Sequence, residues 1–547
     1  MPPITTNTLF YGDNLPILRD YFDDESVDLI YLDPPFNSNR SYNVLFKDES
    51  GEEAEAQITA FEDTWHWNAH TEQVYHDLVT LSDPRTSDMI SALRQFIGTN
   101  QVMAYLVMMT VRLIELHRVL RKSGTLYLHC DPTSSHYLKI VLDTIFGVKN
   151  FRNEIVWKRT GAKSLAFTRF ASNHDIILRY SKSGKAIWNP QYIAHDPEYI
   201  EKFYRYTDPG TGRRYRLGDL TNPNKDRPNL TYKFLGVTRV WRWTQERMQE
   251  AYDDGLIIQR KPGGVPAYKR YLDEQEGTPV GDIWTDILPV QSQSKEILPY
   301  PTQKPVALLE RIVNAGSNKG DTVLDPFCGC GTTIAAAQQL DRRWIGIDIT
   351  HLSIALQKYR LKDLFGLVEK KNYAVIGEPE DFSSALQLAE DNRYQFQWWA
   401  LSLIKARPLG SESGGKRGKK GADKGVDGII TFIDETAGKP KRILVQVKSG
   451  KVKSGDIRDL RGTVEREKAA MGIFITLEPP TKPMETEAAG AGIYHSPGWN
   501  EDYPKMQNIT IAELLDGVAV KMPPTAKTFK LAGRVKSNNE DEQNGLF

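Results

Sequence analysis

The feature that most constrains the fold of this chain is a glycine-rich turn between two apolar runs. The first run, Val323–Asp325, leads through this turn into a predicted helix, Ile334–Leu340, and a second run, Trp344–Asp348, ends in an acid about twenty residues after the turn. Glycines at a strand–helix junction let the backbone approach a ligand, and the acid lies where a doubly wound fold binds ribose hydroxyls. A phosphate loop would need Gly-Lys-Ser/Thr, but Gly331 is followed by Thr332, which disfavours a nucleoside triphosphate. The segment therefore predicts a Rossmann-like α/β fold.

A second constraint is the tetrapeptide Asp33-Pro34-Pro35-Phe36, directly after the apolar run Val27–Leu32. The run predicts a buried strand, and the two prolines hold the backbone rigid beyond it, with carbonyls free of competing N–H groups. An amino nitrogen conjugated to a ring is a poor nucleophile because its lone pair is delocalised. Asp33 and the carbonyl of Pro34 could accept its two hydrogens and so free the lone pair, while Phe36 offers a face to an unstacked base. The alternative is a strand followed by an ordinary Pro-Pro turn.

Together these motifs resemble the DNA N6-adenine/N4-cytosine amino-methyltransferases of the beta arrangement, which use S-adenosylmethionine. In that family the catalytic half precedes the cofactor half, as Asp33 precedes Asp325 here, and Tyr300–Pro305 resembles the family's third cofactor motif. The resemblance covers roughly residues 7–375 and implies that Asp33, Pro34, Pro35 and Phe36 are catalytic. It implies the following cofactor contacts: Asp325, Pro326, Phe327, Gly329, Gly331, Thr332, Asp348, Gln303, Lys304 and Pro305.

The segment Gly124–Asp131 resembles a strand of the family's catalytic half. For its polar tip, His129 and Asp131, a catalytic role and a local structural role both stay open.

The resemblance favours adenine N6 as the target, because family members with Asp at the position of Asp33 mostly act on adenine, whereas many N4-cytosine enzymes have Ser. Methylation at cytosine C5 needs a thiol nucleophile, which the enzymes of that kind carry on a Pro-Cys pair, and none of the three cysteines here follows a proline. Cys328 and Cys330 have no second pair or nearby histidine for a metal site, so we expect them to fill small spaces in the cofactor loop.

The net charge is zero, so a DNA-binding surface has to be local. Between Glu201 and Arg247 there are eleven basic and five acidic residues, interleaved with aromatic ones. Basic side chains suit phosphates, and aromatic ones can stack where a base leaves the helix. This pattern predicts a target-recognition insert at residues 160–290; the alternative is a solvated, loop-rich insertion. The expected partner is double-stranded DNA, with a homodimer as a possible assembly.

Three cysteines preclude a disulfide framework and suit a reducing interior. There is no signal peptide and no uninterrupted apolar run long enough to cross a bilayer. We therefore expect a cytoplasmic protein that does not contact membranes.

Beyond residue 380 the sequence predicts a β-hairpin within a smaller α/β domain. The runs Val426–Ile433 and Lys441–Lys448 are strand-like, and a seven-residue turn joins them. Pairing them antiparallel about the turn places Ile433 opposite Lys441.

In this register Asp427 lies opposite Val447, and Gln446 and Lys448 project together beside it because residues two apart share a face. Asp427, with the side-chain oxygen of Gln446 or the Val447 carbonyl, could hold Mg²⁺, and Lys448 could orient the attacking water. The region resembles the Mrr-like branch of the PD-(D/E)xK nucleases, with Gln446 in place of the usual acid. The resemblance implies a Mg²⁺-dependent endonuclease; the alternative is an inactive nuclease fold used for binding.

The whole sequence thus predicts a restriction–modification fusion. The rivals are an orphan DNA methyltransferase with a DNA-binding tail, and an N4-cytosine or RNA methyltransferase. The predicted divisions are a catalytic half (1–159), the insert (160–290), a cofactor half (291–376), the endonuclease-like domain (381–532) and a disordered tail (533–547).

Overall fold

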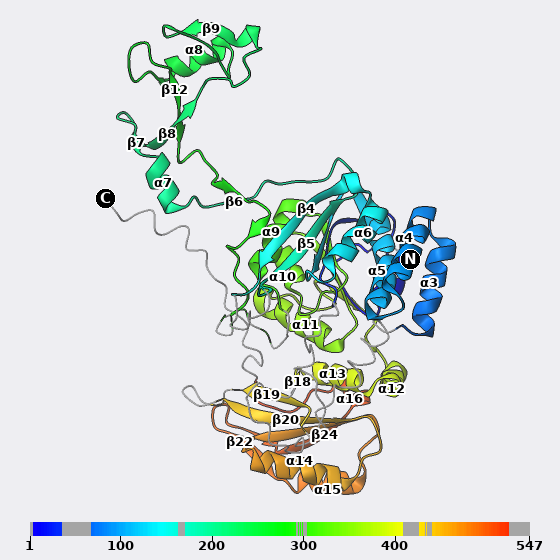
Figure 1. Cartoon of the computed structure of the whole chain (residues 1–547). Coiled ribbons are helices and arrows are strands. Elements are labelled where there is room, and N and C mark those ends of the chain that lie inside the picture. Colours follow the sequence, from blue (N-terminus) through cyan, green and yellow to red (C-terminus); the bar gives the residue numbers. More distant parts are fainter. Residues whose placement is uncertain are drawn as a thin grey trace. The chain divides into compact units, whose positions relative to one another are not determined.

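The computed structural model describes residues 4–35, 67–161, 170–291, 294, 296, 298, 303–408, 426–432, 434 and 440–524. The chain divides into two compact units, one formed by residues 190–281 and the other by the residues on either side of them. The larger unit contains the predicted Rossmann-like sheet and a second, smaller sheet (Figure 1). No described helix has both the length and the apolar character that a membrane-spanning helix needs.

The described part of the larger sheet has nine strands in the order β14–β4–β5–β3–β2–β15–β16–β1–β17. These strands are β1 (Thr8–Tyr11), β2 (Val27–Leu32), β3 (Leu120–Cys130), β4 (Phe151–Lys158), β5 (His174–Ser181), β14 (Ile283–Trp284), β15 (Thr322–Asp325), β16 (Arg343–Asp348) and β17 (Ala374–Ile376). Only β5 runs against its neighbours; all the other pairings are parallel. The carboxyl ends of the parallel strands and the amino end of β5 therefore meet at one edge.

Helices cover both faces of this sheet. Alternate strand residues such as Ile30 and Leu126 share a core with α1 (Asn14–Tyr21), α5 (Gln101–Val119) and α6 (Ser135–Phe146). The residues between them face the other way, toward α9 (Val306–Gly316) and α10 (Thr332–Gln339). On that side Gly316 of α9 lies against Leu29 and Tyr127, and Gly346 of β16 lies against Ile334 of α10. All six residues of β2 are buried, which explains why five of them are apolar or aromatic; the sixth, Asp28, is paired with Arg121 at 2.8 Å.

Two further helices, α3 (Ala69–Leu81) and α4 (Pro84–Ile97), pack on α5 and α6. The side chains of Asp83 and Asn100 cap the amino ends of α4 and α5, as expected for residue types that favour this position.

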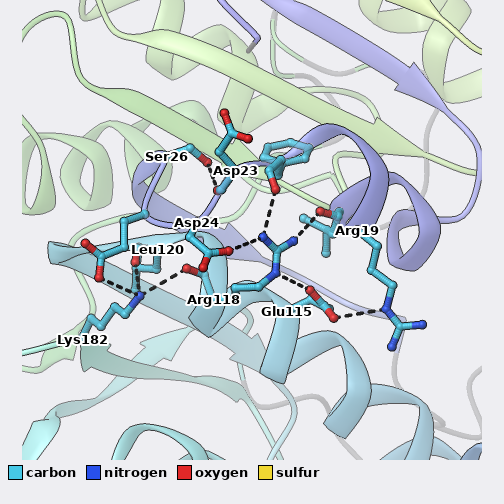
Figure 2. Close-up of polar contacts among 11 residues, drawn as sticks. Arg19, Asp23, Asp24, Ser26, Glu115, Arg118, Leu120 and Lys182 are labelled. Atoms are coloured by element: carbon cyan, nitrogen blue, oxygen red, sulfur yellow. Dashed lines mark hydrogen bonds and ion pairs between the residues drawn. The ribbon is translucent and has the colours of Figure 1, made fainter. Parts of the chain in front are cut away.

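An arginine network fastens the edge opposite the carboxyl ends (Figure 2). Arg118, near the end of α5, donates to Glu115 at 2.7 Å, to Asp24 at 2.7 Å and to the carbonyl oxygens of Leu18 and Phe22. Lys182, just after β5, donates to the carbonyl oxygen of Leu120 at 2.6 Å. These bonds connect α1, α5 and the start of β3. They fix the ends of the strands that lie opposite the polar carboxyl edge.

The unit 190–281 has its own small sheets. Its elements are β6 (Tyr192–Ile193), α7 (Pro197–Phe203), β7 (Tyr206–Thr207), β8 (Arg214–Asp219), β9 (Thr231–Phe234), β10 (Val237–Val240), α8 (Gln245–Asp253), β11 (Ile257–Ile258), β12 (Ala267–Tyr271) and β13 (Thr278–Pro279). The predicted insert 160–290 contains this unit but also includes β5 and β14, which are strands of the main sheet.

The smaller sheet of the larger unit has the order β18–β19–β20–β21–β24. Helices α12 and α13 pack on one of its faces and α14 and α15 on the other. The elements are α12 (Phe382–Asp391), α13 (Arg393–Leu403), β18 (Arg407–Pro408), β19 (Gly428–Phe432), β20 (Lys441–Lys448), α14 (Ser454–Arg466), β21 (Met471–Thr476), α15 (Lys482–Ala489), β22 (Ile493–Ser496), β23 (Glu501–Pro504), β24 (Met506–Thr510) and α16 (Ile511–Leu515).

The predicted register of the β19–β20 hairpin was wrong by one residue. Phe432, not Ile433, lies opposite Lys441, and the ladder ends with Gly428 opposite Val445. The connection between the strands is one residue longer than predicted, and in a hairpin the connection sets the register.

Candidate active site

Three carboxylates gather at the carboxyl edge of the larger sheet. Asp33 follows β2, Asp325 ends β15 and Asp348 ends β16. Because these strands are parallel neighbours, residues far apart in sequence are brought to one edge, where open α/β sheets bind ligands. The sequence predicted all three as site residues.

Asp33 forms an ion pair with Lys304, which lies just before α9. The resemblance assigned Lys304 to the cofactor, but the structure places its ammonium group on the carboxylate predicted to receive the target amine. Pro34 is buried and Pro35 is half-buried. Phe36 lies outside the described residues.

A buried polar network lies behind Asp33. The Tyr31 hydroxyl is 2.9 Å from His129 Nδ1, and His129 Nε2 is 3.2 Å from Asp175 Oδ2. Burial raises the pKa of Tyr31 well above its ordinary value, so this hydroxyl keeps its proton and donates it to Nδ1. Nε2 then carries the imidazole hydrogen and donates to Asp175. This network links β2, β3 and β5 directly below the point where Asp33 leaves the sheet.

Arg159 completes the network with an ion pair to Asp175 at 3.0 Å. Burial alone would raise the pKa of Asp175, but the bond from His129 and the charges of Lys304 and Arg159 hold it below its ordinary value. His129, for which the sequence left two roles open, therefore supports the end of the strand that carries Asp33. Asp131 has a local role, because it accepts bonds from the N–H groups of Thr133 and Ser134.

The glycine-rich turn is built around Asp348. The N–H of Gly329 donates to Asp348 Oδ2 at 2.9 Å, and Thr350 donates to Oδ1. Gly331 has a φ of 73°, and a Cβ there would lie 2.6 Å from Cγ of Gln357. Only glycine fits this position without displacing Gln357.

Residues that the sequence did not single out hold this turn from outside. Asn14 donates to the carbonyl oxygen of Pro326 at 2.8 Å and is itself held by Arg112. From α11 (His351–Phe365), Gln357 donates to the carbonyl oxygen of Gly329 at 2.9 Å, and Arg360 to that of Cys330 at 3.1 Å. The free thiols of Cys328 and Cys330 are buried, as predicted.

The other predicted cofactor residues differ in what their side chains do. Gln303 is used locally, because it accepts from the Leu298 N–H and donates to the Glu296 carbonyl oxygen. Pro305 is the residue before α9, and the hydroxyl of Thr332 accepts a bond from Arg360. Phe327 is half-buried, and its N–H donates to Asp325 Oδ1 at 3.1 Å.

Asp325 is the most deeply buried of the three carboxylates, with 2% of its surface exposed. Burial raises its pKa to about 7; the bonds from Thr333 and the Phe327 N–H oppose this rise, while the charges of Asp33 and Asp348 add to it. Burial also raises the pKa of Asp348. A cationic amine beside Asp325 would favour its ionised form, so this edge suits a ligand with an ammonium group and a ribose.

The predicted metal site in the smaller domain is different. Asp427 lies just outside the β19–β20 ladder, and its Oδ2 accepts the N–H of Val447 at 2.6 Å. Gln446 is buried, and its Oε1 has no hydrogen-bond partner among the described residues. Lys448 is half-buried. The part of the chain that the structure describes contains no group of three or more His, Cys, Asp or Glu side chains that could hold a metal ion.

Helix α13 connects the nine-stranded and the five-stranded sheet of the larger unit. Gln395 of α13 accepts the N–H of His351, the first residue of α11, at 2.9 Å. Trp398 of α13 packs in a buried cluster with Leu352 and Leu356 of α11 and with Cys330 of the glycine-rich turn. Helix α13, which also packs on the smaller sheet, therefore supports the helix that holds the turn.

A mostly parallel sheet with helices on both faces, a glycine-rich turn and three acids at the carboxyl edge defines the class of α/β proteins that bind nucleotide-like ligands there. Within this class, the DNA methylase family of N6 and N4 methyltransferases matches residues 27–356, and the chain belongs to this family.

Curated relatives agree with this assignment. The type II methyltransferase M.EcaI of Enterobacter cloacae is 31% identical over 350 residues, which are 63% of this chain and 67% of that protein. The StyLTI Mod subunit of a type III restriction-modification enzyme of Salmonella typhimurium is 27% identical, over 61% of this chain and 50% of that protein. The DNA adenine methyltransferase YhdJ of Escherichia coli is 24% identical, over 65% of this chain and 82% of that protein.

The smaller domain matches a different family. Residues 413–516 match the family described as NACHT-associated inactive restriction endonuclease 1. A restriction-endonuclease-like domain was predicted, but its assignment to the Mrr-like branch is not confirmed. The predicted endonuclease activity and Mg²⁺ site at Asp427, Gln446 and Lys448 are not supported.

Proposed function

We propose that this chain methylates the N6 amino group of adenine in double-stranded DNA, as a methyltransferase of the restriction-modification type. The observation that carries the proposal is the meeting of Asp33 with Asp325 and Asp348 at one sheet edge. A base held at Asp33 and a cofactor held at the glycine-rich turn would then lie side by side.

The cofactor that suits this edge is S-adenosylmethionine, which supplies an activated methyl group. Asp325 would bind its ammonium group and Asp348 its ribose hydroxyls. The backbone at Pro326, Phe327, Gly329 and Gly331 would approach it closely, because a Cβ at Gly331 has no room. Asn14, Gln357 and Arg360 keep that backbone in place.

The target amine would donate its hydrogens to Asp33 and to the carbonyl of Pro34, so that its lone pair becomes available. We assign Phe36 to stacking on the everted base. Lys304 orients the Asp33 carboxylate, and Tyr31, His129 and Asp175 fix the strand end from which Asp33 projects.

Adenine is favoured over cytosine for two reasons. The acid Asp33 stands where the family's adenine enzymes mostly have one, and the related YhdJ is named a DNA adenine methyltransferase. N4-cytosine is the second candidate. For the smaller domain we propose a non-cleaving role, because a neutral Gln446 replaces the usual acid and Asp427 accepts a backbone N–H.

Incubation of the purified chain with labelled S-adenosylmethionine and duplex DNA, single-stranded RNA or protein tests the substrate class. Long-read sequencing of the duplex product then reports the modified base and its sequence context. We expect N6-methyladenine at a defined site. Labelled N4-methylcytosine would overturn the choice of base, and label in RNA or protein alone would overturn the proposed function.

A further inference from the structure

The unit 190–281 has an uneven distribution of charge. Its segment Leu220–Trp243 has five basic residues and one acid, whereas the rest of the unit has ten basic residues and twelve acids. We call Leu220–Trp243 the basic hairpin, because the two-stranded β9–β10 sheet lies within it. The excess positive charge of the unit is therefore confined to one part of it.

Among the described residues of the unit, the basic residues that form ion pairs all lie outside the hairpin. Outside the hairpin, Arg213 pairs with Asp273 and Glu274, Arg214 with Glu201, and Lys269 with Asp208. In the basic hairpin the following residues are exposed and form no ion pair within the described part of the chain: Lys225, Arg227, Lys233, Arg239 and Arg242. The charge of Arg242 also helps to lower the pKa of Asp219. Six basic residues outside the hairpin are likewise exposed and form no ion pair within the described part of the chain: Lys202, Arg205, Arg247, Arg260, Lys261 and Arg270. The hairpin is therefore distinguished by its net positive charge, because the cations outside it are outnumbered by acids.

Buried packing anchors the hairpin on the rest of the unit, and two hydrogen bonds stabilise it internally. Trp241 is fully buried and packs with Phe234 and Met248, and its Nε1 donates to the Tyr232 carbonyl oxygen at 2.9 Å. The Tyr232 hydroxyl donates to the Trp243 carbonyl oxygen at 2.8 Å. Strands and side chains anchored in this way need little ordering when a ligand binds.

The outer face of the hairpin is polar. Lys233 lies opposite Thr238 in the β9–β10 register, and Thr231 lies two residues before Lys233 on the same face. All three are exposed, whereas Phe234, on the opposite face, is buried. The flanking residues Lys225, Arg227 and Arg242 extend the positive charge beyond the strands.

We propose that the basic hairpin is the part of the chain that reads the target duplex. This inference rests on the proposed function and names the element that selects its DNA. A two-stranded ribbon fits the major groove of DNA, which is about 12 Å wide. Lys233 contacts base edges from the outer face, while Lys225, Arg227 and Arg242 bind phosphates on either side.

The test uses the full chain and two duplexes, one with the sequence that the parent protein methylates and one with that sequence shuffled. The triple variant Lys225→Ala, Arg227→Ala, Arg242→Ala is expected to weaken binding to both duplexes about equally. The slope of log affinity against log salt concentration should fall by about 2–3, since each phosphate contact contributes roughly 0.9. Lys233→Ala is expected to reduce discrimination between the duplexes by about tenfold to a hundredfold.

The control is Arg213→Ala, Arg214→Ala, which removes two positive charges that are already paired. It should leave both affinities within about twofold of the parent. Arg227→Lys, which keeps the charge, should retain phosphate binding. The affinity for S-adenosylmethionine and the melting temperature show whether each variant is folded.

The two proposals fail in different ways. If the parent methylates no DNA, the proposed function fails whatever the hairpin does. If the parent methylates a defined site but the triple variant and Lys233→Ala bind and discriminate as the parent does, the assignment of the hairpin is wrong. Stronger loss in the Arg213→Ala, Arg214→Ala control would move the DNA-binding surface to the other part of the unit.

Discussion

The nine-stranded and five-stranded sheets of the larger unit both have polar residues beside apolar strands, but among the described residues only the nine-stranded sheet brings several acids together at one edge. At the larger sheet, Asp33, Asp325 and Asp348 come from three neighbouring parallel strands. At the smaller sheet, Asp427, Gln446 and Lys448 come from one hairpin, and the single acid accepts the N–H of Val447. Polar residues beside a strand are common to both sheets. What distinguishes the larger sheet is that the ends of several neighbouring strands bring their acids together.

Exchanging one acid at each edge for alanine gives the largest expected difference. Asp33→Ala should lower the methylation rate about a hundredfold to ten-thousandfold, because the target amine loses its acceptor. Binding of S-adenosylmethionine should change little, since Asp325 and the glycine-rich turn are intact. Single-turnover methylation and calorimetric cofactor titration measure the two effects.

The matched change is Asp427→Ala, which should leave methylation within about twofold and cost about 1 kcal/mol of stability for the lost hydrogen bond. Equal methylation rates for the two variants would show that the larger sheet edge is not the active site.

Buried polar side chains give the second contrast. His129→Ala removes the partner of the Tyr31 hydroxyl and leaves Asp175 with only its ion pair to Arg159, so it should lower the free energy of unfolding by about 2–4 kcal/mol. The methylation rate should fall about tenfold to a hundredfold through displacement of Asp33. Tyr31→Phe removes only the hydroxyl, so a smaller loss of rate with an unchanged KM for S-adenosylmethionine would identify a positioning role.

At the other sheet, Gln446→Leu should change the unfolding free energy by less than about 1 kcal/mol, because its buried amide oxygen has no partner among the described residues. Chemical denaturation compares the two sites directly. A large decrease in the free energy of unfolding for Gln446→Leu would mean that the amide forms a stabilising polar interaction in the folded protein.

The raised pKa of Asp325 predicts that cofactor binding at the larger sheet depends on pH. With its pKa near 7, Asp325 is protonated in much of the protein below that pH, and a bound ammonium group has to displace this proton. The affinity for S-adenosylmethionine should therefore fall as pH drops below 7, by up to about tenfold per pH unit. Asp325→Asn should bind weakly at every pH, without this slope; a slope that survives the substitution would come from another group.

For DNA cleavage by the smaller domain we expect no effect at all. The parent, incubated with Mg²⁺ and unmodified DNA, should leave the DNA intact with or without S-adenosylmethionine, and Lys448→Ala should methylate as the parent does. Cleavage that Lys448→Ala abolishes would restore the endonuclease assignment and remove the contrast between the two sheets.

Local pattern was enough to find the elements at both edges. β2 and β20 begin and end at the predicted residues, and the glycine-rich turn with Asp348 lies where spacing predicted it. These features depend on apolar runs and backbone freedom, which neighbouring residues encode.

Contacts between segments that are distant in sequence could not be predicted from local pattern. Lys304 reaches Asp33 across 271 positions of sequence, and His129 reaches Asp175 across 46. The spacing of apolar residues along the sequence does not predict such pairs, because they form only when the strands assemble into a sheet. The one-residue error in the β19–β20 register has a related cause: the length of the connection, not the strand pattern, decides which residues face each other.

The packing of α13 on α11 determines where this protein can be divided. A chain shortened to residue 376 would lose Gln395 and Trp398, and so would expose Leu352 and Leu356 and leave the first N–H of α11 without its acceptor. Keeping residues through Leu403 retains Gln395 and Trp398, but it removes the sheet on which Phe396 and Trp399 of the same helix pack. Helix α13 lies between the two family matches, which cover residues 27–356 and 413–516, and a division on either side of it exposes apolar side chains.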